Sequence, residues 1–142
     1  METGITTHKF VAVLNKKIPV PLLINALGHM SAGLGASYSN VAEMRFDTYL
    51  DKDGGAHQSI SDNPFIILAA DNSNKLRTLR GELMSVGIHF NDFTSTMTVG
   101  TYAEQKERTK NTPESELEYY GICMFGEKEK LNALTKKFSL WK

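Results

Sequence analysis

The sequence predicts an α/β fold, in which a mixed β-sheet is flanked by helices. Three short apolar runs have the length and composition of buried strands. Between them lie segments whose apolar residues recur every three or four positions, which indicates helices with one buried face. The resulting order is strand, helix, hairpin, strand, helix, strand, helix. This order predicts a single sheet with helices packed against it.

The first apolar run, KFVAVLN at 9–15, predicts a strand that is buried on both faces. Pro19 and Pro21 follow and predict a loop, because proline lacks an amide hydrogen and restricts the residue before it to extended geometry. A helix is then predicted over 22–36. Its buried face is expected to consist of Leu23, Ala26, Leu27, Met30 and Leu34.

The middle of the chain predicts two further strand regions. Alternation of apolar and polar residues over 44–50 predicts a half-buried strand. Residues 53–55, Asp-Gly-Gly, predict a hairpin turn, because glycine tolerates positive φ. The second apolar run, PFIILAA at 64–70, is expected to be the most buried strand of the sheet.

Helix and strand signals continue to the end of the chain. A helix over 74–86 is expected, because residues 71–73 offer N-cap side chains and Gly87 can end the helix. The third apolar run at 117–126 predicts another strand, and a charged amphipathic helix follows it. The segment SLW at 139–141 is expected to form a short edge strand.

Composition limits the class of protein. The 142 residues are 41% hydrophobic, which fits one domain over 1–142 with one core. Sixteen Lys and Arg balance sixteen Asp and Glu, which argues against a dedicated nucleic-acid binder. Cys123 is the only cysteine, so an internal disulfide is excluded. Without an apolar span or a secretory signal, we expect a cytoplasmic protein that does not enter a membrane.

The stretch FNDFTSTM at 90–97 is the first candidate for a functional site. It places Asp92 four residues before Thr96, and Asn91 directly before Asp92, inside an apolar frame. Two interpretations are open: a site loop, or a turn in which Asp and Thr side chains bond to nearby backbone. The polar segment at 101–116 follows directly, and we expect it to form helical turns that pack near Asp92 as a lid.

Asn25 and His29 are the second candidate. They are four residues apart, so a helix places them on one face. His29 could act as a base or a hydrogen-bond donor to a ligand, or it could simply bond to a backbone carbonyl. Asn25 could bind a ligand or hold the proline loop against the sheet. Cys123, in the middle of a strand, is expected to be an inert buried thiol. The histidines have no metal-site spacing and no phosphate loop is present, so we expect no metal and no cofactor.

Four long segments resemble an uncharacterised family, the domain-of-unknown-function family numbered two thousand. They are IPVPLLINALGHMSAGLG, NPFIILAADNSNKLRTLR, NDFTSTM and LEYYGICMFGEKEKLNALTKKFSLW. The order of elements, with an Asp-x-x-x-Thr loop before the last strand and helix, also looks like the type 2 peptidyl-tRNA hydrolases, to which that family is regarded as related. The resemblance covers about 9–141. It implies a hydrolase-like fold and a homodimer, because the hydrolases form dimers.

The same resemblance implies roles for individual residues. Asp92 and Thr96 fall at the positions of the hydrolases' site Asp and Thr, where a carboxylate positions water and a hydroxyl holds it. The match fails at the lysine that would stabilise the oxyanion, because Val20 and Leu22 occupy the lysine positions. Lys16 or Lys17 could replace it only if the loop folds differently.

Three functions are therefore considered. The leading one is a small ligand-binding or regulatory module on a hydrolase-like scaffold, with Asn25, His29 and Asn91 binding the ligand. The second is a hydrolase of peptidyl-tRNA or another ester or amide, using Asp92 and Thr96, and only this one involves tRNA. The third is a self-associating protein without a small-molecule site, in which the SLW edge pairs with another copy.

Overall fold

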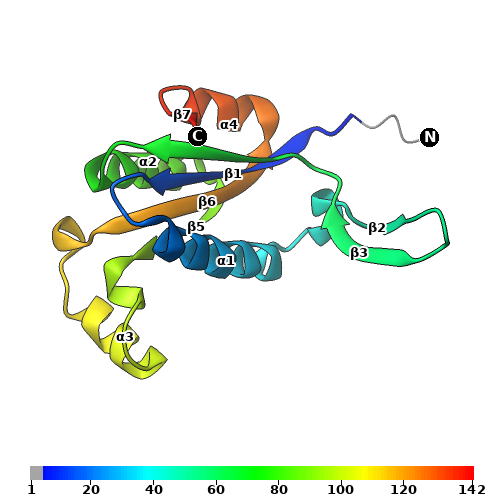
Figure 1. Ribbon diagram of the computed structural model, residues 1–142. Coiled ribbons are helices and arrows are strands. Elements are labelled where there is room, and N and C mark those ends of the chain that lie inside the picture. Colours follow the sequence, from blue (N-terminus) through cyan, green and yellow to red (C-terminus); the bar gives the residue numbers. More distant parts are fainter. Residues whose placement is uncertain (1–4) are drawn as a thin grey trace.

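The computed structural model describes residues 5–142 and has the predicted architecture, a mixed sheet with helices on both faces (Figure 1). The main sheet has the strand order β5-β6-β1-β4-β7. Its strands are β1 (His8–Asn15), β4 (Phe65–Ala70), β5 (His89–Thr94), β6 (Tyr119–Glu127) and β7 (Ser139–Leu140). β1 and β4 are parallel, and the other neighbouring strands are antiparallel. β5 and β7 are therefore the two edges of the sheet.

The helices divide between the two faces of the sheet. One face is covered by α1, and the other by α2 and α4 (Figure 1). The helices are α1 (Val20–Ser37), α2 (Ser73–Val86), α3 (Tyr102–Lys110) and α4 (Lys128–Thr135), with short 3-10 helices at η1 (Val41–Met44), η2 (Ser95–Met97) and η3 (Glu114–Glu116). α3 lies outside both layers and protrudes beyond the β5 edge (Figure 1).

Alternation along β1 explains why the core has two layers. Phe10, Ala12 and Leu14 pack on the α1 side, whereas Val11 and Val13 pack on the α2 side. β1 and β6 are the most buried strands. The prediction that 64–70 would be the most buried strand is wrong. β4 is mostly half-buried because its outer neighbour, β7, is only two residues long.

The start of α1 differs from the prediction. The helix begins at Val20, so Pro21 lies in its first turn and not in a loop. Proline is tolerated there because amides of the first turn have no partner within the helix. The predicted buried face is confirmed, with Leu23, Ala26 and Met30 at most 1% exposed. The prediction that Leu27 belongs to it is only partly confirmed, because Leu27 is half-buried.

The predicted hairpin is confirmed, with β2 (Phe46–Leu50) and β3 (Ala56–Ser61) joined through Gly54 at φ 83°. The prediction that its first strand is half-buried is wrong, because every residue of β2 is exposed. The two strands form a separate sheet that projects from the domain (Figure 1). The alternation of apolar and polar residues therefore predicted the strand correctly, but it did not show that the strand packs against no core.

The predicted boundaries of α2 are confirmed. The side chain of Asn72 accepts a hydrogen bond from the backbone amide of Lys75 at 3.0 Å, and Gly87 ends the helix at φ 71°. The edge strand expected at the C-terminus is present as β7, which pairs with Leu68 and Ala69 of β4. Self-association through this edge stays a prediction.

Candidate functional site

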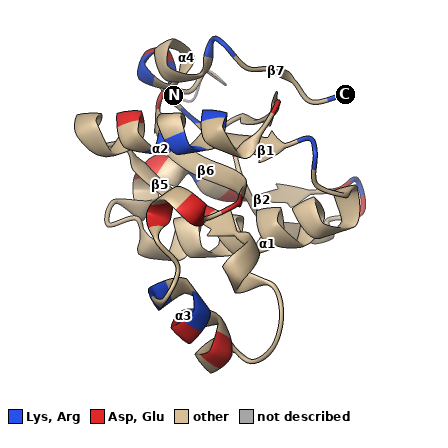
Figure 2. Cartoon of the chain, turned by 90° about the vertical axis from the view of Figure 1, so that its left-hand side faces the viewer, with Lys and Arg blue, Asp and Glu red and all other residues tan. Residues whose placement is uncertain are grey.

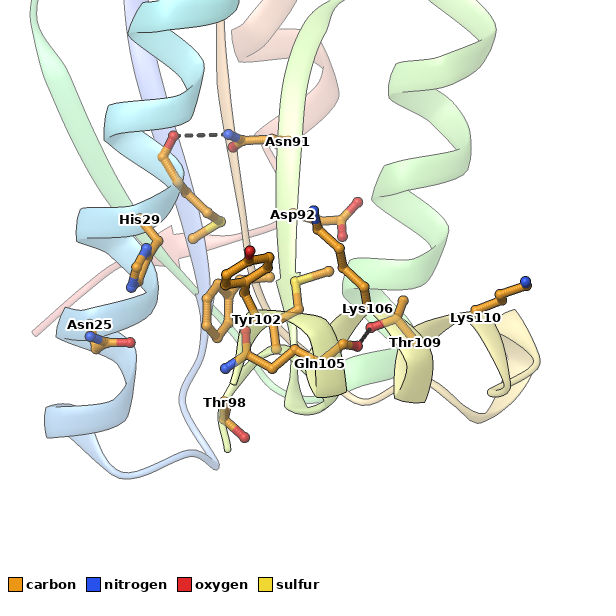
Figure 3. A pocket seen from close by; sticks show the side chains of 13 residues that line it. Asn25, His29, Asn91, Asp92, Thr98, Tyr102, Gln105, Lys106, Thr109 and Lys110 are labelled. Atoms are coloured by element: carbon orange, nitrogen blue, oxygen red, sulfur yellow. Dashed lines mark hydrogen bonds between the residues drawn. The ribbon is translucent and has the colours of Figure 1, made fainter. Parts of the chain in front are cut away.

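A cleft of about 930 Å³ lies at the β5 edge of the sheet, between α1, β5 and α3 (Figure 3). Its apolar lining comes from Met30, Phe93, Met97 and Tyr102. Polar side chains surround this floor: Asn25, His29, Asn91, Asp92, Thr98, Gln105, Lys106, Thr109 and Lys110. The cleft thus collects four of the five site residues predicted from the sequence.

β5 positions two of these side chains on opposite faces of the sheet. Asn91 points to the α1 side, where its Nδ2 donates to the backbone oxygen of Met30 at 2.9 Å (Figure 3). Its Oδ1 is buried and accepts no hydrogen bond within residues 5–142. A buried acceptor without a donor is uncommon. This acceptor therefore lies unpaired inside the wall of the cleft.

Asp92 points to the other side, toward α2. Arg80 of α2 donates from Nε to its Oδ2 at 3.1 Å. Burial lowers the pKa of Arg80, but the hydrogen bond to Asp92 and the nearby Tyr119, Asp92 and Glu114 outweigh burial and raise it. Arg80 therefore neutralises the candidate catalytic carboxylate.

Thr96 does not line the cleft. Its hydroxyl is buried in η2, 2.6 Å from Oγ1 of Thr94, and it accepts a hydrogen bond from Oγ1 of Thr109 at 2.8 Å. Thr109 belongs to α3. The structure therefore places Thr96 beneath the cleft, where it ties α3 to the domain, while its predicted partner Asp92 lines the cleft.

Asn25 and His29 project from the exposed side of α1 into the cleft (Figure 3). The His29 ring stacks on Phe93 at 5.9 Å, and neither polar side chain has a hydrogen bond within the described chain. His29 therefore does not bond to a backbone carbonyl of the described chain, and Asn25 does not hold the proline loop against the sheet. Asn15 holds the loop after β1 instead, donating to the Tyr119 backbone oxygen at 3.0 Å and accepting from the Lys17 amide.

α3 forms the outer wall and supplies the residues that the sequence did not indicate. Arg108 attaches the helix by donating to the backbone oxygens of Thr96 and Val99, both at 3.0 Å. Lys106 extends from α3 toward Asp92, whereas Lys110 points away (Figure 3). The prediction that 101–116 packs near Asp92 is confirmed. That it opens and closes as a lid stays a prediction.

Neither Lys16 nor Lys17 lines the cleft, so neither replaces the missing lysine there. Lys16 pairs with Asp71 at 2.9 Å. The hydrogen bonds from Lys16 and Lys75 lower the pKa of Asp71 to about 2. The lysine that shares the cleft with Asp92 and extends toward it comes instead from α3, as Lys106 (Figure 3).

Cys123 is buried under α1, as predicted, and burial raises the pKa of its thiol to about 12. Within residues 5–142, no group of three His, Cys, Asp or Glu side chains is arranged to hold a metal ion. In the same range, no helix combines the length and apolarity needed to cross a membrane.

The fold and the cleft define a small α/β protein with an open cleft at one edge of a mixed sheet. The family model described as protein of unknown function (DUF2000) matches residues 8–142, so the chain belongs to that family. The solved structure of Atu0240, a protein of unknown function from Agrobacterium tumefaciens strain C58, covers 97% of this chain and 100% of its own, with 17% identity and a TM-score of 0.82. This likeness shows the fold alone. No curated protein matches the chain.

Proposed function

We propose that the protein is a small-molecule-binding module and that the cleft between α1, β5 and α3 is its binding site. One observation carries the proposal: Asn25, His29 and Lys106 line the same cleft as an apolar floor, and within residues 5–142 none of the three forms a hydrogen bond or an ion pair. Binding sites commonly combine an apolar lining with a few converging polar groups. The cleft volume of about 930 Å³ fits a metabolite-sized ligand.

Two elements supply these unpaired groups: Asn25 and His29 come from α1, and Lys106 comes from α3. All three side chains are exposed, so they are open to a molecule that enters the cleft. The amide and the imidazole offer both donors and acceptors, and the ammonium group offers donors.

Native mass spectrometry of protein purified gently from cells tests this proposal. We expect a population whose mass exceeds that of the chain by one ligand. The variant Gln105→Trp places an indole in the cleft and should lose the added mass. Glu107→Trp, on the same helix but outside the cleft lining, should keep it. A bare chain in every preparation, or equal retention by both variants, would count against a ligand site.

An ester or amide hydrolase is the second candidate, because Lys106 extends toward Asp92 within one cleft (Figure 3). Arg80 occupies Oδ2 of Asp92, so Oδ1 is the oxygen that could position a water. Lys106 would stabilise the developing oxyanion. In this proposal Lys106 replaces the lysine that the resemblance implies and the motif lacks, and Thr96 supports the site through α3.

Cleavage of peptidyl-tRNA by the purified protein tests the hydrolase candidate. Asp92→Asn and Lys106→Gln should each abolish turnover, whereas Thr96→Val should reduce it by loosening α3. Absence of activity, or activity that Asp92→Asn leaves intact, would rule out this mechanism for that substrate. Simple ester and amide substrates extend the test to the wider class.

A further inference from the structure

We propose that the ligand is an amphipathic organic anion, whose acid group binds Lys106 while its apolar part lies on the floor of the cleft. This inference rests on the proposed binding function and names the chemical class of the ligand. Three observations support this inference: the charges around the cleft, the positions of those charges along the cleft, and the ion pair that Asp92 already forms with Arg80.

The charged groups of the cleft leave a positive excess. Asp92 is the one carboxylate in the lining, and Arg80 already pairs with it at 3.1 Å. Lys106 also lines the cleft, and within residues 5–142 it forms no ion pair. α1 contributes no Lys, Arg, Asp or Glu, so its ribbon is uniformly tan in Figure 2. An anionic group is therefore favoured over a cationic one.

The carboxylates of α3 lie outside the cleft. Glu104 accepts a hydrogen bond from the Thr101 backbone amide at 3.0 Å, within the cap of the helix. Glu107 accepts one from Asn111 at 3.2 Å. Neither glutamate lines the cleft. The Lys106 ammonium group is thus the charge that α3 contributes to the cleft.

The positions of these groups match an amphipathic molecule. Lys106 and Asp92 lie at one end of the cleft and Asn25 and His29 at the other, with Tyr102 between them (Figure 3). The Lys106 ammonium lies 5.2 Å from the centre of the Tyr102 ring, a cation–π distance. A ligand with its acid group at Lys106 would extend over Met30, Phe93 and Met97.

A pair of fluorescent probes tests the charge of the ligand. Anilinonaphthalene sulfonate is an amphipathic anion, and phenylnaphthylamine has the same ring system without the acid. Titration at low salt should show both binding to the wild type, with the anion bound more tightly. Lys106→Gln should weaken binding of the anion about three- to tenfold, as expected for the loss of one partly exposed charged hydrogen bond. The same variant should change the affinity for the neutral probe by less than about twofold.

Matched variants keep the test specific. Lys106→Arg retains the charge and should retain anion binding, as should Lys136→Gln, which removes an exposed lysine at the end of α4. Tyr102→Ala should weaken binding of both probes, a result that would locate their binding site in the cleft. Tyr102 is 74% exposed, so the fold should tolerate the loss of its ring. Asp92→Asn should tighten binding of the anion, because it removes a negative charge that repels the probe.

The outcomes separate the two proposals. If the neutral probe binds as tightly as the anion, or if Lys106→Gln affects both equally, the cleft remains a binding site and the anionic class is wrong. Weaker anion binding by Asp92→Asn would also overturn the class. If neither probe binds, or if Tyr102→Ala leaves both unchanged, the binding function and the ligand class both lose their support.

Discussion

The two helices that face each other across the cleft are held in opposite ways. α1 has 18 residues, four of them buried, and needs no side-chain cap at its start. α3 has nine residues, none of them buried, and begins with a capping box between Thr101 and Glu104. Core packing fixes one wall, and a few polar contacts fix the other. Lys106 lies on the weaker wall, whereas Asp92 lies on the domain side of the cleft.

Leu34→Ala should produce the largest effect, because Leu34 is fully buried between α1 and the sheet. Loss of a buried leucine typically lowers the free energy of unfolding by about 2–5 kcal/mol. Tyr102→Ala on α3 should change it by less than about 0.5 kcal/mol, because the ring is exposed. Urea unfolding of both variants measures the contrast. Equal losses would mean that α3 packs as firmly as α1.

Arg108→Gln should release α3 while leaving the domain folded. The guanidinium donates two hydrogen bonds to backbone oxygens, those of Thr96 and Val99. Hydrogen bonds from charged donors contribute about 1.5–3 kcal/mol each when both partners are removed from water, and less here, because this site is partly exposed. We expect amide exchange in α3 to accelerate about tenfold or more.

Hydrogen exchange followed by mass spectrometry resolves this effect by segment. Peptides from α1 and β6 should exchange as in the wild type. Lys110→Gln on the same helix is the control, because its side chain points away from the domain (Figure 3). Acceleration throughout the molecule would show that α3 is part of the cooperative core.

The sequence predicted those elements whose signals are local. The buried faces of α1 and α2 follow from apolar spacing, and the ends of α2 from Asn72 and Gly87. The burial of 64–70 and of 44–50 could not be predicted in the same way. Burial depends on what lies beside a strand, and the short β7 and the projecting hairpin are tertiary features.

The site was predictable on the domain side of the cleft only. Asn25 and His29 share a helix face, and Asp92 follows from its motif, so these candidates come together in the structure. Thr96 turns inward because η2 interrupts the strand after Thr94. Lys106 carried no signal, because a polar helix without an apolar face gives no indication of what it docks against.

The thiol of Cys123, which is buried beneath α1, should make the free energy of unfolding depend on pH. Burial raises its pKa from 9.0 to about 12, so between these values the folded state keeps a proton that the unfolded state has lost. The free energy of unfolding should therefore fall as pH rises above about 9, by at most about 1.4 kcal/mol per pH unit for one group. Unfolding between about pH 8 and pH 10 measures the slope.

Cys123→Ala is the matched variant for this slope. It should lose the dependence below about pH 10, whatever its absolute stability. The remaining fall at higher pH should reflect the tyrosines whose pKa values are raised, chiefly Tyr38 and Tyr119, both raised to about 12, together with Tyr49 and Tyr120. The hydrogen bond to Glu43 is the main cause for Tyr38, and burial for Tyr119. A slope that persists unchanged in Cys123→Ala would mean that the thiol is not protected by α1.

The smallest effect on global stability should come from Thr101→Ala, and it compares most directly with Asn72→Ala. Both residues are N-caps whose side chains accept a backbone amide hydrogen bond, at 3.2 Å for Thr101 and 3.0 Å for Asn72. Each cap contributes about 1 kcal/mol to its own helix.

Because α2 carries core residues, Asn72→Ala should lower the free energy of unfolding by that amount. Thr101→Ala should change it by only a few tenths while helical chemical shifts disappear from α3, because a nine-residue helix is marginal on its own. Equal global losses would show instead that the outer wall of the cleft is as much a part of the folded core as the inner one.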